Sequence, residues 1–164
     1  GLCYLNQRHY AFAEQALRNA LKRRPQARQL RYALVNALIA QLRFDEAADD
    51  IATLREQNPE DMRAVTLAGQ IEFERGDLDR AQSLLEESLR RNPAQSAAAD
   101  TLISVYHQRG EPESALAMLD DLVQAHPELD FAWNGLVLWT RNDPARAAAS
   151  ALRWSRRSRH GVNC

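Results

Sequence analysis

The chain has 164 residues, six glycines, six prolines and a formal net charge of −1. This length suits one ordinary domain, and the near-balanced charge excludes both a strongly basic nucleic-acid binder and a highly charged disordered chain. No apolar run approaches the roughly 18 residues that a membrane-spanning helix needs, so direct membrane insertion is not predicted.

A period of 34 residues runs along the chain. Apolar residues recur three and four apart twice in each period, which predicts two helices that a short turn separates and a proline ends. One register kept across several such series predicts a repeat array of all-α class. Residues at this step include Pro25, Pro59, Pro93 and Pro127, then Ala13, Ala47, Ala81 and Ala115, and also Leu17, Ile51, Leu85 and Leu119.

Taken in chain order, the periods predict a partial first repeat over 1–27 and full repeats over 28–61, 62–95 and 96–129. In the third, a first helix around Leu67 is followed by a turn at Gly76 and a second helix that Pro93 ends. The last repeat, 130–164, begins with Trp133 and then degenerates into a capping helix over about 145–157 and a basic tail.

These residues resemble the tetratricopeptide repeat, whose 34-residue unit is a helix–turn–helix. The resemblance covers nearly the whole chain and implies a right-handed α-α superhelix, a solenoid of antiparallel helix pairs, as a single domain over 1–164. Arg8 and Leu42 stand where the third and fourth repeats have glycine, so we expect turns of different backbone geometry there.

The resemblance also implies that the first helix of each pair lines a concave groove that holds a peptide or a helix of a partner protein. A solvated face that binds nothing remains the alternative. The groove positions projected onto this chain for partner binding are Tyr32, Asn36, Arg63, Thr66, Gln70, Phe73, Asp100, Ser104, His107, Gln108 and Asn134.

No catalytic constellation is visible in the sequence. The four histidines have no second histidine three or four residues away, and no phosphate loop, zinc-type cysteine pair or nucleophile elbow occurs. Acidic pairs such as Asp120-Asp121 are more typical of solvated helix faces than of metal sites. We therefore predict no catalytic residues, no metal, no cofactor and no enzymatic activity.

Charge is segregated along the chain, with a net charge of +6 over 1–31, −12 over 32–140 and +5 over 141–164. Two interpretations stay open, ordinary charged outer faces or an acidic middle that steers a basic partner. RNA-binding pentatricopeptide repeats run one residue longer, and the acidic middle repels phosphate, so no nucleic acid is predicted as a partner.

Some members of the resembled family grip the C-terminal carboxylate of heat-shock chaperones with clustered lysine, asparagine and arginine. Asn36 is similar to one such residue, but other residues stand near the remaining clamp positions, so chaperone-tail binding is not predicted. The departing positions are Tyr32, Leu67, Ala97 and Thr101.

The function predicted from the sequence is that of a protein–protein interaction scaffold. The alternative is a non-catalytic arm that orients the protein substrate of a larger enzyme such as a transferase. The chain begins without methionine inside a first helix, so we expect a longer protein upstream. Self-association through this N-terminal end is the third alternative. Composition suggests a bacterial source, and Cys3 and Cys164 as free thiols favour the cytoplasm over the periplasm.

Overall fold

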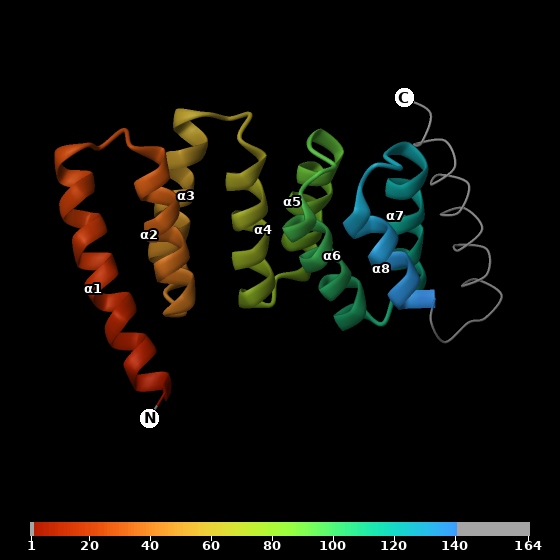
Figure 1. The fold of residues 1–164 in the computed structure, drawn as a ribbon, viewed down its shortest axis with the longest axis horizontal. Helices are drawn as coiled ribbons and strands as arrows, with labels where there is room; N and C mark the ends of the chain where they lie inside the picture. The colour runs from red at the N-terminus through yellow and green to blue at the C-terminus, as the bar shows by residue number, and fades with distance from the viewer. Residues whose placement is uncertain (1, 141–164) are drawn as a thin grey trace. The chain divides into compact units, whose positions relative to one another are not determined.

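The computed structural model describes residues 2–140, with side chains from His9 to Trp139, so the predicted capping helix and basic tail lie outside the described residues. Within this part the chain forms α-helices and no strand (Figure 1). None of the described helices is both long and apolar enough to cross a membrane. The helices are α1 (Leu2–Arg23), α2 (Arg28–Ala40), α3 (Phe44–Gln57), α4 (Met62–Arg75), α5 (Leu78–Arg91), α6 (Ser96–Arg109), α7 (Pro112–Ala125) and α8 (Asp130–Thr140).

The helices keep the 34-residue period of the sequence. The first helices α2, α4, α6 and α8 begin at residues 28, 62, 96 and 130, and the second helices α3, α5 and α7 begin at residues 44, 78 and 112. Pro112 occupies the first turn of α7, where the missing N–H costs no hydrogen bond. The all-α prediction is therefore confirmed over the described residues.

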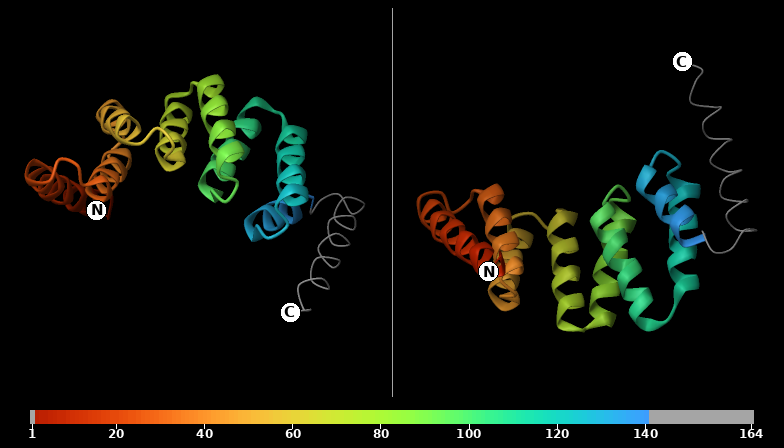
Figure 2. Two further views of the ribbon diagram at one scale, coloured as in Figure 1. Left: turned by 90° about the horizontal axis from the view of Figure 1, so that it is seen from above. Right: turned by 60° about the horizontal axis from the view of Figure 1, so that its bottom comes forward.

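The chain divides into two compact units, Gly1–Ser88 and Leu89–Cys164. In the first unit, α1 packs on α2, α2 on α3, and α3 on α4, each helix antiparallel to the one before it (Figure 2). In the second unit, α6 packs on α7 and α7 on α8. The single array expected over 1–164 stays a prediction.

The core of the first unit consists of the positions that recur at the repeat step. Ala47, Ile51 and Leu54 of α3 are at most 2% exposed, and they pack with Leu38 and Val35 of α2. A close helix approach also explains Gly69, because a Cβ there would lie 2.8 Å from Cγ of Leu85 on α5. Small residues at these positions let neighbouring helix backbones approach each other.

The core of the second unit repeats this arrangement two periods later. Ala115 and Leu119 of α7 are at most 1% exposed and Leu102 of α6 is fully buried. Trp133 of α8 is 4% exposed, and its indole Nε1 donates a 2.9 Å hydrogen bond to the carbonyl oxygen of Pro127. The indole thus joins the start of α8 to the loop before it, with its one polar group satisfied.

The turns after α2, α4 and α6 share one geometry, which corrects our expectation for Leu42. Leu42 has φ +59°, in the same left-handed region as Gly76 (+83°) and Gly110 (+71°). The residue after each turn donates to a carbonyl five residues back, from Arg43 N to Leu38 O at 3.0 Å in the first case and at 2.9 Å in the other two. The hairpin therefore imposes the backbone conformation even where leucine replaces glycine.

The turn expected near Arg8 does not form, and this prediction is wrong. Helix α1 runs without a break from Leu2 to Arg23, through the position at which the other repeats turn. No glycine or proline lies between Leu2 and Arg23, so nothing interrupts the helical hydrogen bonds at Arg8. As a result Ala13 is exposed, whereas Ala47, Ala81 and Ala115, which match it in the other repeats, are fully buried.

Candidate functional site

A pocket of about 530 Å³ lies at the amino-terminal ends of the first helices α2 and α4, within the first unit. The loop before α2 supplies part of its wall, and the residue that caps α4 supplies another part. We call it the arginine pocket; its lining residues are Gln26, Ala27, Arg28, Gln29, Tyr32, Asp61 and Arg63.

Asp61 organises the arginine pocket through both oxygens of its carboxylate. Oδ1 accepts a 3.1 Å hydrogen bond from the backbone N–H of Arg63, which caps the amino end of α4. Oδ2 accepts a 2.6 Å hydrogen bond from the hydroxyl of Tyr32 and an ion-pair contact from Nη2 of Arg28. Asp61 therefore ties the first turn of α2 to the first turn of α4.

Tyr32 is 3% exposed and forms the base of this arrangement. Burial raises the pKa of Tyr32, although the positive charges of Arg28 and Arg63 oppose the increase. The hydroxyl therefore stays protonated and remains a hydrogen-bond donor to Asp61. The guanidinium of Arg63 lies over the aromatic ring, with its Cζ 4.1 Å from the ring centroid, a cation–π distance.

The first unit contains six of the residues predicted to line the groove. Asn36 and Arg63 are exposed, and Gln70 and Phe73 are half-buried. Thr66 is only 3% exposed, and its Oγ1 lies 2.7 Å from Oγ of Ser88. Since Tyr32 and Thr66 are buried and hydrogen-bonded inside the unit, we do not propose that either contacts a partner.

The second unit contains the other five predicted residues. Asp100, His107 and Gln108 of α6 are exposed, and so is Asn134 of α8. Ser104 is half-buried and donates a 3.0 Å hydrogen bond to the carbonyl oxygen of Asp100. The ring of His107 on α6 contacts the ring of Trp139 on α8 edge to face, with ring centroids 6.5 Å apart.

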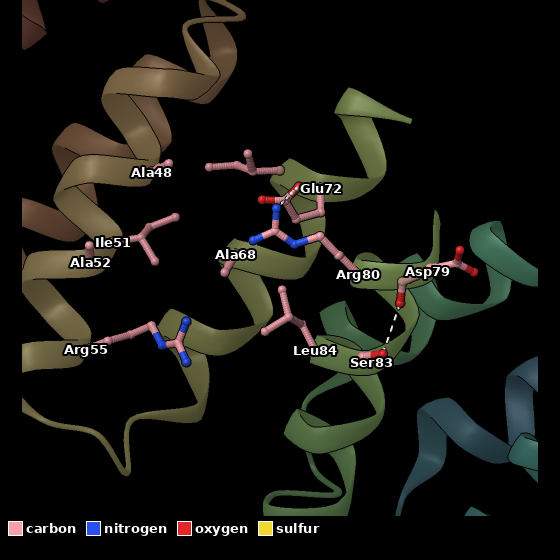
Figure 3. A pocket seen from close by; sticks show the side chains of 11 residues that line it. Ala48, Ile51, Ala52, Arg55, Ala68, Glu72, Asp79, Arg80, Ser83 and Leu84 are labelled. Carbon is pink, nitrogen blue, oxygen red and sulfur yellow. Dashed lines mark hydrogen bonds and ion pairs between the residues drawn. The ribbon is translucent and has the colours of Figure 1, made fainter. Parts of the chain in front are cut away.

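A second kind of pocket lies between successive second helices. In the first unit, a pocket of about 460 Å³ lies between α3 and α5 (Figure 3), and Ala68 and Ile71 of α4 also line it. Arg80 lies 3.9 Å from the carboxylate of Glu72 within it. A pocket of about 630 Å³ in the second unit repeats this position, with Leu89 of α5, Tyr106 of α6 and Met118 of α7 among its lining residues. Its recurrence suggests a packing feature of the hairpins.

The described residues contain no group of three or more histidine, cysteine or acidic side chains that could hold a metal ion. Although burial opposes the shift, the pKa of Glu14 on α1 is lowered, and the cause is its ion pairs with Arg18 and Arg43. The polar groups of the arginine pocket suit the binding of a ligand rather than catalysis. The pocket combines guanidiniums and amides with one carboxylate that is already hydrogen-bonded.

Sequence reasoning missed Arg28, Asp61, Gln26 and Gln29 as parts of a site. A signal was present, because Arg28 and Asp61 are opposite charges 33 residues apart, almost one repeat period. Residues one period apart in an array of this kind lie on neighbouring first helices, so such pairs indicate contacts between repeats.

Two family models, both described as tetratricopeptide repeat, match residues 32–96 and 72–139 of the chain. No curated protein matches it in sequence. The crystal structure of MamA is similar, with a TM-score of 0.62 and 16% identity over 89% of this chain and 85% of that chain. YrrB, described as a TPR protein with an unusual peptide-binding site, has a TM-score of 0.60 and 24% identity over 80% of this chain and 68% of that chain.

PilF of Pseudomonas aeruginosa is similar as well, with a TM-score of 0.66 and 17% identity over 95% of this chain and 72% of that chain. At such identities these likenesses show the fold alone. The predicted class, an all-α helical solenoid of antiparallel helix pairs, is thereby confirmed.

Proposed function

Since this chain belongs to the tetratricopeptide repeat family, we propose that it is a protein-interaction scaffold whose first helices hold a peptide or a helix of a partner protein. The fold is in general one of protein interaction, and its repeats are typically non-catalytic. The similar protein YrrB is described as having a peptide-binding site, which supports a peptide as the kind of ligand.

The observation that carries this proposal is a set of exposed polar side chains on the first helices. In the first unit, Asn36 and Arg63 are exposed, and within the described part of the chain their side chains form no hydrogen bond or ion pair. In the second unit, Gln108 and Asn134 have the same character. Amides and guanidiniums with unused donors are suited to the backbone and polar side chains of a peptide.

The proposal is tested by capture experiments with the whole protein and substitutions on the first helices. We expect Asn36→Ala and Gln70→Ala each to weaken binding of the captured partner about tenfold or more, as loss of a central interface side chain does. The melting temperature of each variant reports whether the hairpins remain folded.

Arg55→Ala is the matched control, because Arg55 is an exposed arginine on the second helix α3. Full binding by this variant, together with loss in the two first-helix variants, supports the proposal. Loss of binding in Arg55→Ala alone would place the partner on the second helices and contradict it.

A further inference from the structure

The arginine pocket has more hydrogen-bond donors than acceptors available to a ligand. Its one carboxylate, that of Asp61, accepts from Arg63 N–H on Oδ1 and from Tyr32 and Arg28 on Oδ2. A donor group of a ligand therefore finds both carboxylate oxygens of Asp61 already occupied by hydrogen bonds. An acceptor group of a ligand does not compete for these oxygens.

The donors that remain belong to residues that line the pocket. Arg63 is exposed, and no carboxylate of the described residues forms an ion pair with its guanidinium, which the ring of Tyr32 holds in place at 4.1 Å. Gln26 and Gln29 line the same pocket with exposed amides, and Nε of Arg28 is buried without a hydrogen bond.

The formal charge of the lining is +1, since two arginines face one aspartate. One guanidinium without a carboxylate partner matches one monoanionic group. A dianion would face the carboxylate of Asp61 at short range, and the like charges would repel each other.

We propose that the arginine pocket is a carboxylate subsite for the partner peptide, in which Arg63 pairs with a carboxylate and the amides of Gln26 and Gln29 assist. This rests on the proposed function, which makes the ligand a peptide. The planar fork of a guanidinium fits the two oxygens of a carboxylate. Stacking on Tyr32 fixes this fork before the ligand arrives, so less conformational entropy is lost on binding. The carboxylate belongs either to an acidic side chain or to the C-terminus of the peptide.

The subsite differs from the chaperone-tail clamp that the sequence lacks. Of the clamp positions only Tyr32 takes part in it, as the ring on which Arg63 stacks, and Leu67, Ala97 and Thr101 do not line the pocket. Arg28 and Asp61, which build it, lie outside the predicted set of groove residues. Its affinity arises from one stacked arginine, held by a capping aspartate and a buried tyrosine.

The test uses three acetylated hexapeptides of alanine and serine, and the Nε–H resonance of Arg63 in the whole protein. One peptide carries an internal glutamate and a C-terminal amide, the second an internal glutamine and a free C-terminus, and the third an internal glutamine and an amide. We expect the first or the second to shift the resonance to saturation, and the third to bind at least about tenfold more weakly, as loss of a charge-assisted hydrogen bond implies. Whichever peptide binds identifies the source of the carboxylate.

Arg63→Gln should abolish the difference between the acidic and neutral peptides, and Arg55→Gln, on α3 outside the pocket, should retain it. Equal shifts with all three peptides, no shift with any, or an unchanged preference in Arg63→Gln would overturn the subsite. Failure of the proposed function appears separately, as partner capture that the first-helix substitutions leave intact.

Discussion

Thr66 and Ser88 form a buried pair of hydroxyl groups, with their oxygens 2.7 Å apart between α4 and α5. Ser88 is fully buried, and its Oγ also lies 3.3 Å from the carbonyl oxygen of Met62. One repeat earlier and one repeat later the same position is Leu54 and Leu122. A polar residue is therefore accommodated in a leucine position because the facing first helix supplies threonine.

Removing one hydroxyl of this pair should lower the free energy of unfolding more than removing both hydroxyls does. We expect Ser88→Ala to destabilise the protein by about 1–3 kcal/mol, because it leaves Thr66 buried without its partner. Adding Thr66→Val should recover part of the loss. Urea unfolding of the two single variants and the double variant measures the coupling, and strictly additive effects would show that the hydroxyls do not depend on each other.

The uncovered face of α1 allows a matched test of helix packing. Ala81→Trp places a large side chain at a fully buried crossing of helices, and we expect a loss of about 1–3 kcal/mol. Ala13→Trp occupies the matching position of α1, where the side chain is exposed, and should change stability by no more than about 0.5 kcal/mol. Thermal unfolding of both variants checks this, and equal losses would contradict the assigned packing.

Leu42 pays a conformational cost that Gly76 does not. The left-handed conformation costs an ordinary residue about 1–2 kcal/mol, and the leucine side chain is 72% exposed, so little packing opposes its removal. We expect Leu42→Gly to stabilise the first unit by up to about 1 kcal/mol after the entropy cost of glycine.

The reverse change, Gly76→Leu, should destabilise by about 1–2 kcal/mol. No atom lies within 4 Å of a Cβ built at Gly76, so backbone strain alone is tested there. Denaturant midpoints that move in the same direction for both variants would show that the turn does not require this conformation.

Glu14 predicts a dependence of stability on pH. Burial raises its pKa, but hydrogen bonds from Arg18, Arg43 and Gln41 outweigh burial and lower the pKa below the ordinary 4.5. The stabilisation is therefore fully present above about pH 4.5 and is lost as the pH falls through the folded-state pKa. Glu14→Gln should be less stable at neutral pH and should lose less stability on acidification.

Glu56→Gln is the control, because Glu56 is an exposed glutamate of α3. Urea midpoints measured from neutral pH into the acid range compare the two variants. A wild-type slope in Glu14→Gln would exclude Glu14 as the responsible group.

The sequence predicted the repeat well because its signal is the period itself. Residues that recur at 34 positions, such as Ala47 and Ala81, occupy equivalent buried sites. The prediction was wrong at Arg8, where α1 continues through the position at which the other repeats turn. Whether a turn forms there depends on tertiary packing, which a motif position does not encode.

Exposure of the groove residues could not be predicted from their position in the repeat. Tyr32, Thr66, Asp100 and Asn134 occupy one repeat position, yet the first two are buried and the last two are exposed. The difference lies in the residues that face them, Asp61 for Tyr32 and Ser88 for Thr66. The exposure of these residues therefore depends on side chains from other helices. The repeat pattern describes positions within one helix and does not contain this information.

In the first unit, the hairpins are joined by charge as well as by apolar packing. Glu14 contacts Arg43, Arg18 contacts Glu46, and Arg75 contacts Asp45, and each pair joins residues of different repeats. Added electrolyte weakens such partly exposed pairs and leaves the apolar interior almost unaffected. The first unit should therefore become less stiff as the salt concentration rises. The loss of stiffness should occur at the contacts between repeats and not within each helix pair.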